Sequence, residues 1–244
     1  MCRLLAYASR GTSSFPDAVG PHFQEFVQLS SIHHDGWGIA DDRGNLTLDT
    51  DAAKDSVKFP EAISATQSDA ALLHLRWASP GIPVDISNNH PFKFGDYSFI
   101  HNGSLHPYDA LDSVLTGRYK AEIKSASDSH RYFMFLMQNI DNAGLVHGIQ
   151  QTIAEIRAHA TYASLNSMML TPEYLVIINE HDVNNRPSIV DELYYDLHYK
   201  LDGDSFAIAS SGWNQEGWEF LPNHSIMLVH RHDLTVQIMT IPTN

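Results

Sequence analysis

Two amphipathic helices set between groups of short strands constrain the fold of this chain most. Residues 127–140 and residues 142–160 both repeat apolar side chains at helical spacing, which predicts one buried face on each helix. Ser127 or Asp128 is expected to cap the first helix, since both side chains accept hydrogen bonds from free backbone N–H groups. The apolar faces consist of Phe133, Leu136, Met137 and Ile140 in the first helix, and Leu145, Ile149, Ile153 and Ile156 in the second.

Short strands joined by short turns occupy most of the remaining chain. After residue 162 they are YASLNSMMLT, EYLVIINE, ELYYDLHYK, SFAIASS, SIMLVHRH and TVQIMTI. Earlier strands are expected near residues 3–8, on both sides of a turn within 36–50, at 71–79 and at 97–103. Short connections favour antiparallel pairing. The pattern predicts an α+β layered domain whose helices cover antiparallel sheets, and periodicity leaves open whether there is one sheet or two.

Composition narrows the class of protein. No repeat, low-complexity tract or linker divides the sequence, so we expect a single domain over residues 1–244. The 29 acidic and 15 basic residues give a net charge of -14 without a basic stripe, which disfavours nucleic acid as a partner. No apolar run has membrane-spanning length, and the first residues lack the features of a signal peptide. These observations predict a soluble, cytoplasmic protein.

Cys2 is the only cysteine in the chain, and it directly follows the initiator methionine. A lone cysteine excludes an internal disulfide framework and a cysteine-rich zinc site. Removal of Met1 would expose an α-amine beside the thiol, and an α-amine with a pKa near 8 can accept the thiol proton. The sequence therefore offers Cys2 as a self-activated nucleophile, and the alternative is a small apolar residue without a catalytic role.

Three further positions combine a reactive side chain with a predicted boundary of a helix or strand. Arg76 follows an apolar strand in HLRWASPG, where its guanidinium can grip a carboxylate or form a surface ion pair. Asn102 and Gly103 at a predicted strand end form either a tight turn or an oxyanion hole. Asp128 at a helix start either caps the helix or binds a substrate ammonium.

The 15 histidines are scattered along the chain. His33 and His34 are adjacent, so on a strand their side chains point apart, and no third ligand stands at helical spacing. His74, His90 and His101 lie beside the motifs and are interpreted as hydrogen-bonded structural residues. We therefore expect no metal and no cofactor.

Taken together and in this order, Cys2, HLRWAS, NNHPF, FIHNGSL and SDSH closely resemble the glutaminase domain of class II glutamine amidotransferases, which are N-terminal nucleophile hydrolases. The resemblance covers about residues 1–140. The words HDGWGIA and SSGWNQEGWEFLP are most similar to a compact single-domain branch that includes the γ-glutamyl hydrolase of ergothioneine biosynthesis and a glutathione-degrading enzyme. The resemblance implies a four-layer αββα sandwich.

The resemblance also implies a role for each matching residue. Cys2 would be the nucleophile with its own amine as the base, and Asn102 with Gly103 would form the oxyanion hole. Arg76 would bind the substrate α-carboxylate and Asp128 the α-ammonium. The pocket would be lined by Trp77 and Ser79, chiefly through backbone groups.

The sequence departs from the family pattern in two places. Ser79-Pro80 replaces the usual Thr-His, and Pro80 lacks a backbone donor that a pocket wall could use. His130 stands where the family usually has glutamate. Both departures concern recognition of the glutamyl group and leave the nucleophile and the oxyanion hole unchanged.

The activity implied by the resemblance is hydrolysis of glutamine or another γ-glutamyl amide through a thioester on Cys2. Strands after residue 162 are expected to complete the domain, which favours a free-standing hydrolase. One alternative is a glutaminase subunit that delivers ammonia to a separate synthase. Another is a binding module that keeps the fold without activity. The expected ligand is a small γ-glutamyl molecule, and neither a nucleic acid nor a membrane is an expected partner.

Overall fold

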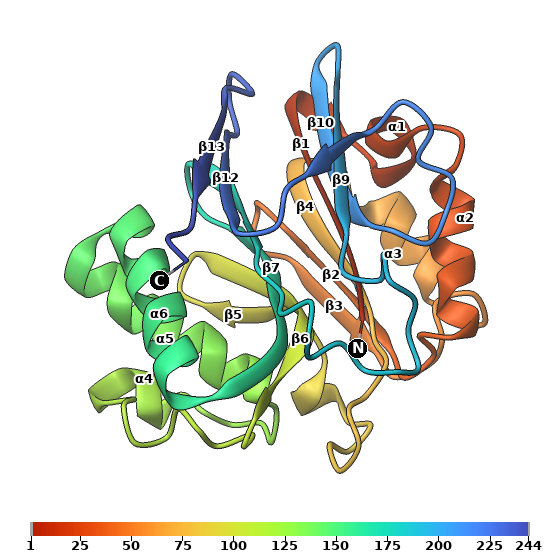
Figure 1. The fold of residues 1–244 in the computed structure, drawn as a ribbon. Coiled ribbons are helices and arrows are strands. Elements are labelled where there is room, and N and C mark those ends of the chain that lie inside the picture. The colour runs from red at the N-terminus through yellow and green to blue at the C-terminus, as the bar shows by residue number, and fades with distance from the viewer. Residues whose placement is uncertain (1, 244) are drawn as a thin grey trace.

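The computed structural model describes residues 2–243. Two antiparallel sheets pack face to face, and helices cover the outer face of each sheet (Figure 1). This is the four-layer αββα sandwich that the resemblance implies, and it answers the question that periodicity left open: there are two sheets.

The first sheet contains seven strands in the order β11-β9-β10-β1-β4-β2-β3 within the described residues. Helices α1 (Phe15–Val19), α2 (Phe23–Gln28) and α3 (Phe59–Ala65) lie over its outer face. Its strands are β1 (Arg3–Ser13), β2 (Trp37–Asp41), β3 (Leu46–Asp49), β4 (Ser68–Leu75), β9 (Leu197–Asp202), β10 (Ser205–Ser210) and β11 (Glu219–Leu221).

The second sheet contains six strands in the order β13-β12-β8-β7-β6-β5 within residues 2–243. Helices α4 (Gly117–Ala121), α5 (Asp128–Ala143) and α6 (Leu145–His159) lie on its outer side (Figure 1). Two short 3-10 turns complete the structure, at Leu29–Ser31 and Ile86–Asn88. The strands are β5 (Phe92–Phe94), β6 (Tyr97–His106), β7 (Thr161–Leu170), β8 (Tyr174–Asn179), β12 (Ser225–His230) and β13 (Val236–Thr240).

Alternating side chains of β1 show how one strand serves two cores. Leu4 and Ala6 point into the layer between the two sheets, whereas Leu5 and Tyr7 pack against the helices on the outer face. All four are fully buried. A strand that is covered on both faces needs apolar residues at successive positions, which explains the continuous run LLAYA.

The two long helices are confirmed, and Ser127 is the residue that caps α5. Its side chain accepts a hydrogen bond from the backbone N–H of Ser129. All four residues of the predicted apolar face of α5 are buried, as are the three isoleucines of α6. Gly144 separates the two helices with a positive φ of 81°, a conformation that favours glycine.

Two sequence-based assignments were wrong. The stretch ELYYDLHYK does not form one strand, because β9 begins only at Leu197 and the preceding residues form a turn. Asn102 and Gly103 do not form a turn at a strand end, since β6 continues through them to His106. The second error matters more, because it moves both residues into the interior of the second sheet.

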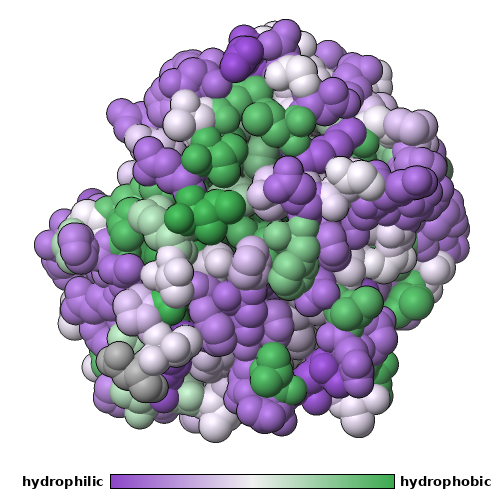
Figure 2. Space-filling model, turned by 45° about the horizontal axis from the view of Figure 1, so that its top comes forward, coloured by the Kyte–Doolittle hydropathy of each residue, from purple (hydrophilic) through white to green (hydrophobic). Residues whose placement is uncertain are grey.

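The surface is mixed. Figure 2 shows one face on which hydrophobic side chains gather in a central band surrounded by hydrophilic ones. Within the described part of the chain, every helix is too short or too polar to span a lipid bilayer.

Candidate active site

Cys2 directly precedes β1, which lies in the first sheet between β10 and β4. The residue is only 6% exposed. Its backbone nitrogen donates a hydrogen bond of 2.7 Å to Oδ1 of Asn102, which belongs to β6 of the second sheet. The thiol lies 3.9 Å from the carbonyl oxygen of Trp77. Contacts from both sheets therefore fix Cys2 between them.

A single small cavity joins six of the seven residues predicted for the site. It measures about 20 Å³, which is room for one water molecule. Asn102 is the seventh residue, and it reaches the site through its hydrogen bond to Cys2. A larger ligand requires the lining to move apart. The six lining residues are Cys2, Arg76, Trp77, Ser79, Gly103 and Asp128.

The surroundings of Cys2 favour the thiolate. Burial by itself raises the pKa of the thiol. The positive terminal amine, the charge and hydrogen bond of His74 and a backbone hydrogen bond with Trp77 act in the opposite direction and lower the pKa from 9.0 to about 6. A thiol with this pKa is largely deprotonated at neutral pH, which is the reactive form of a cysteine.

Asn102 and Gly103 are adjacent residues of β6. Hydrogen bonding restrains the side chain of Asn102, and lack of space requires glycine at position 103. Oδ1 of Asn102 accepts the hydrogen bond from Cys2, while its buried Nδ2 has no hydrogen-bond partner among the described residues. A Cβ on Gly103 would lie 1.8 Å from the carbonyl oxygen of Ser164, so no side chain fits there. The site therefore presents a free amide donor beside a thiol.

Arg76 and Asp128 bring opposite charges to the same cavity. Arg76 is 3% exposed, and its guanidinium donates to the carbonyl oxygens of Pro83 (2.9 Å) and Asp35 (3.5 Å). Asp128 is 4% exposed and accepts a 2.7 Å hydrogen bond from the backbone of Leu105. Within residues 2–243, neither side chain lies within ion-pair distance of an opposite charge. Burial lowers the pKa of Arg76, which shows the cost of holding this cation away from water.

The strand-end position predicted for Arg76 is confirmed, since β4 ends at Leu75. Antiparallel pairing of β1 with β4 places Arg3 opposite Leu75, and this brings Arg76 beside Cys2. Asp35 holds the segment that follows Arg76, because its Oδ2 accepts from the backbone of Ala78 at 2.8 Å. The segments HDGWG and HLRWAS, which are about 40 residues apart in the sequence, are therefore hydrogen-bonded to each other beside Cys2.

Of the residues that depart from the family pattern, Pro80 and His130 lie outside the cavity lining, whereas Ser79 is part of it. Pro80 is exposed, and its carbonyl oxygen accepts from the hydroxyl of Tyr108 at 3.2 Å. The ring of His130 stacks on Phe92, with ring centres 4.5 Å apart. Burial lowers the pKa of His130 to about 4, so this residue is neutral at physiological pH.

The histidines near Cys2 only partly match their interpretation as hydrogen-bonded structural residues. His101 does, because its Nδ1 lies 2.9 Å from Oγ of Ser129 and its Nε2 lies 3.1 Å from the carbonyl oxygen of Ser164. His90 does not, since neither ring nitrogen has a hydrogen-bond partner in the described chain although the residue is buried and lines the cavity. Its ring centre is 4.2 Å from that of His74. No sequence signal separates these two cases.

Tyr194 also reaches the site, and no residue pattern predicted it. Its hydroxyl donates a 3.2 Å hydrogen bond to the carbonyl oxygen of Cys2, 192 residues earlier in the chain. The described residues contain no group of three or more histidine, cysteine, aspartate or glutamate side chains arranged to hold a metal ion.

Comparison with known proteins identifies the family. The family model described as "Glutamine amidotransferases class-II" matches residues 1–185, which is more than half of the chain. The chain therefore belongs to the class II glutamine amidotransferases, which are typically amidohydrolases with an N-terminal cysteine.

Curated relatives share about half of this chain. The sequence is 28% identical over 127 residues to the glutamine–fructose-6-phosphate aminotransferase (isomerizing) of Vibrio vulnificus (strain YJ016), covering 50% of this chain and 20% of that one. It is 26% identical over 130 residues to the probable glutamine amidotransferase DUG3 of Saccharomyces cerevisiae, covering 46% of this chain and 35% of that one. The match thus spans about a fifth to a third of these longer relatives.

Solved structures share the fold over the whole chain. A glutamine aminotransferase class-II domain protein from Silicibacter pomeroyi superposes with a TM-score of 0.70 at 16% identity, covering 99% of this chain and all of the other. The structure described as the allosteric regulatory enzyme of purine biosynthesis gives a TM-score of 0.67 at 17% identity, covering all of this chain and 50% of the other. These similarities support the αββα architecture.

Proposed function

We propose that this protein hydrolyses a γ-glutamyl amide bond through a thioester on Cys2, after removal of the initiator methionine. The proposal depends mainly on one observation: Arg76 and Asp128 are buried opposite charges without ion-pair partners in the described structure, and they line the same cavity as a thiol of lowered pKa. Buried charges without partners are costly, so a cavity of this kind favours a ligand that carries the missing charges. The zwitterionic head of a free amino acid does so.

The chemistry follows from the position of each group. The Cys2 thiolate attacks the δ-carbonyl carbon of the substrate, and the negative oxygen that forms accepts hydrogen bonds from Nδ2 of Asn102 and the backbone N–H of Gly103. The C–N bond breaks, and the leaving amine takes a proton from the α-ammonium of Cys2. The α-amine then removes a proton from water, which attacks the thioester and releases glutamate with the thiol restored.

Asn102 also orients the proposed base. Its Oδ1 accepts from the backbone nitrogen of Cys2 at 2.7 Å, and this nitrogen becomes the α-amine once Met1 is removed. The same side chain would therefore hold the base with its oxygen and the transition state with its nitrogen. A fixed orientation of this kind accounts for part of the rate gain of an enzyme.

Selectivity for a free glutamyl group follows from the two charges. An internal glutamine of a peptide carries neither an α-carboxylate nor an α-ammonium, so it would leave Arg76 and Asp128 buried and unmatched. The identity of the leaving amine is the open part of the proposal. Similarity to the compact branch of the family favours a γ-glutamyl compound such as glutathione or the ergothioneine precursor.

A second candidate function is a glutaminase subunit that passes ammonia to a synthase. It is favoured by the similarity to the glutamine–fructose-6-phosphate aminotransferase of Vibrio vulnificus. Co-purification separates the two candidates. A stable partner that raises glutamine turnover would support the glutaminase subunit. An isolated chain whose turnover does not rise when other proteins are added would support the free-standing hydrolase.

A substrate panel tests the proposal directly. Glutamine, glutathione and a series of γ-glutamyl amides are incubated with the purified protein, and released glutamate is measured. We expect glutamate from at least one γ-glutamyl compound and none with Cys2→Ala, whose circular dichroism should match that of the parent protein. Glutamate release by Cys2→Ala at the parent rate would remove Cys2 from the mechanism.

A further inference from the structure

The segment at residues 180–196 connects the two sheets beside Cys2. It leaves β8 of the second sheet and enters β9 of the first sheet. Most of its middle part is exposed, with Val183, Ile189 and Leu193 each more than 60% exposed. Its last part is different, because Tyr194 is only 3% exposed and Tyr195 only 2%.

Tyr194 contacts the nucleophile residue and its neighbour in the chain. The Arg3 guanidinium lies 3.9 Å above the centre of the Tyr194 ring, and its Nη1 donates a 2.8 Å hydrogen bond to the Tyr194 carbonyl oxygen. The Tyr194 hydroxyl donates to the carbonyl oxygen of Cys2 at 3.2 Å. Cys2 and Arg3 are thus held by one side chain.

The Tyr194 hydroxyl has a second neighbour, Nε2 of His33, at 3.0 Å. The Cys2 carbonyl oxygen can only accept a hydrogen bond, whereas Nε2 donates or accepts according to its tautomer. Nδ1 of His33 lies 3.1 Å from the carbonyl oxygen of Leu29, which can only accept, and burial lowers the pKa of His33 to about 2, so Nδ1 carries the one proton of the neutral ring and Nε2 accepts. The hydroxyl therefore shares its single proton between Nε2 of His33 and the carbonyl oxygen of Cys2. The rings of His33 and Tyr194 are stacked, with centres 6.0 Å apart.

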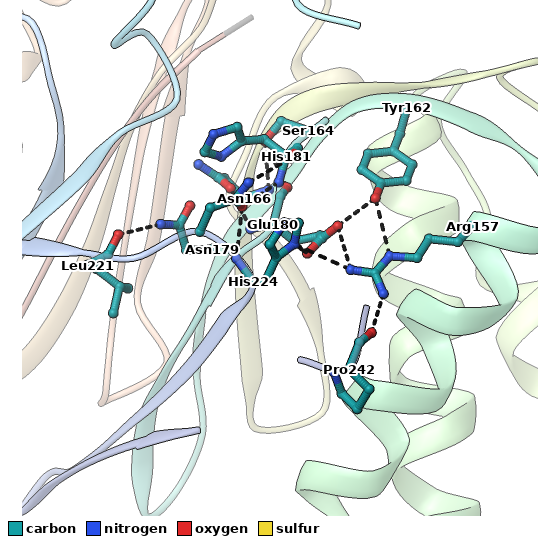
Figure 3. Close-up of polar contacts among 11 residues, drawn as sticks. Arg157, Tyr162, Ser164, Asn166, Asn179, Glu180, His181, Leu221, His224 and Pro242 are labelled. Carbon is teal, nitrogen blue, oxygen red and sulfur yellow. Dashed lines mark hydrogen bonds and ion pairs between the residues drawn. The ribbon is translucent and has the colours of Figure 1, made fainter. Parts of the chain in front are cut away.

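The backbone around Tyr194 is anchored to both sheets. Asn166 of β7 donates from Nδ2 to the Tyr195 carbonyl oxygen at 2.6 Å. Its Oδ1 accepts from the Glu180 backbone at 2.8 Å, and both of these residues are labelled in Figure 3. Ser211, which follows β10, donates from its hydroxyl to the Leu193 carbonyl oxygen at 2.5 Å. Anchors on both sides of Tyr194 allow its hydroxyl to act as a fixed point.

We infer that Tyr194 is a positioning residue that fixes the main chain of Cys2 for attack on the substrate. This inference depends on the proposed function, in which Cys2 becomes the first residue of the mature chain. A terminal residue has only one peptide linkage to restrain it, and chain ends lose order unless they are tied down. The carbonyl group of Cys2 belongs to that one linkage, and its oxygen accepts a hydrogen bond from the Tyr194 hydroxyl. Small misplacements of a reacting atom lower the rate greatly.

Tyr194→Phe tests the inference, and Tyr195→Phe is a matched control. Phenylalanine at position 194 keeps the ring over Arg3 and removes only the hydroxyl. Tyr195 is also buried, but its hydroxyl has no hydrogen-bond partner within residues 2–243. We expect Tyr194→Phe to lower kcat for a γ-glutamyl amide about tenfold with little change in KM, the amount expected for one lost hydrogen bond. Tyr195→Phe should keep the parent kcat.

Alkylation of Cys2 gives a second readout that needs no substrate. The rate of reaction with iodoacetamide rises as the thiol ionises, so in the parent protein its midpoint should lie below the ordinary thiol pKa of 9.0. In Tyr194→Phe the freed residue spends less time beside the groups that stabilise the thiolate, and the midpoint should move upward. Tyr195→Phe should keep the parent midpoint.

The two readouts separate the possible outcomes. A lower melting temperature in Tyr194→Phe, with the parent kcat and the parent alkylation midpoint, would show that Tyr194 only stabilises the fold and would overturn the inference. If the parent protein released no glutamate from any γ-glutamyl compound, the proposed function would fail. In that case the alkylation midpoints would still show whether Tyr194 positions Cys2.

Discussion

Two clusters in this protein contain an arginine and a buried carboxylate. In one cluster the two charges are paired with each other, and in the other they are not. At the end of β8, Glu180 is fully buried, and both of its carboxylate oxygens are paired (Figure 3). Arg157 lies 2.9 Å from one oxygen, which also accepts from Tyr162 at 2.5 Å, and His224 lies 2.7 Å from the other. In the cavity beside Cys2, Arg76 and Asp128 are buried to a similar degree with backbone groups as their main partners.

The difference indicates which cluster stabilises the fold and which one binds a ligand. A paired and hydrogen-bonded charge offsets much of the cost of its burial, whereas an unpaired one leaves that cost in place. The cavity is also lined by His90, whose imidazole has no hydrogen-bond partner in the described structure, and Asn102, which binds the Cys2 nitrogen, has a free amide donor. Buried polar groups usually have hydrogen-bond partners, so free ones beside a reactive thiol are available to a ligand.

The largest expected effect comes from the oxyanion donor. Asn102→Asp keeps an oxygen for the Cys2 nitrogen but removes the free Nδ2 donor and places a negative charge near the reacting carbonyl. We expect kcat to fall by about 10² to 10³. Asn139→Asp is the control, because Asn139 is a buried asparagine of α5 that donates to Thr152 instead of facing the cavity. Steady-state kinetics would contradict the assignment if Asn102→Asp kept kcat within threefold of the parent value.

The next effect compares the two arginines. Arg76→Ala removes the cation proposed to bind the α-carboxylate, so kcat/KM for a γ-glutamyl amide should fall at least about 30-fold, mainly through KM. Arg157→Ala should instead lower the melting temperature and keep KM. The comparison between the two clusters would be wrong if Arg76→Ala changed only the melting temperature.

The carboxylate of the paired cluster should affect stability alone. Glu180→Gln leaves Arg157 without its counter-charge and removes the carboxylate that contacts His224, so it should lower the free energy of unfolding by about 3 kcal/mol. For a chain of this size, that corresponds to a melting temperature lower by roughly 6–12 °C. Glu155→Gln on the exposed surface of α6 is the control and should change little. A normal melting temperature with a large loss of kcat in Glu180→Gln would place this cluster in the catalytic machinery.

The smallest effect concerns a departure from the family pattern. Pro80 lies outside the cavity lining, and alanine keeps the carbonyl oxygen that binds Tyr108. Pro80→Ala should therefore change kcat/KM by no more than about twofold. A tenfold change in KM would show that the loop at Pro80 contacts the substrate.

Local patterns predicted the framework of the site. The apolar run before Arg76 ends where β4 ends, and the helical spacing after Ser127 gives α5 with its cap. Both results depend on side chains that are close in sequence, and periodicity reports such contacts well. The order of the motifs along the chain predicted the family, and the family in turn predicted the sandwich of two sheets.

Long-range contacts account for what the sequence could not show. Asn-Gly usually favours a turn, but here Gly103 is needed because its backbone passes close to Ser164 of the neighbouring strand. ELYYDLHYK alternates like a strand, yet Tyr194 and Tyr195 bind Arg3, Cys2 and Asn166 instead. These partners lie between about 30 and 190 residues away in the chain, so no local pattern reports them.

The most direct test of the central claim is to label the protein with 6-diazo-5-oxo-L-norleucine, a reactive analogue of glutamine, and to locate the adduct by peptide mass spectrometry. The account predicts a single adduct on the sulfur of Cys2, in a peptide that begins with Cys2 because Met1 has been removed. Excess glutamate should slow the labelling. A peptide that retains Met1, or an adduct on any residue other than Cys2, would contradict the proposal that this sulfur attacks a glutamyl amide.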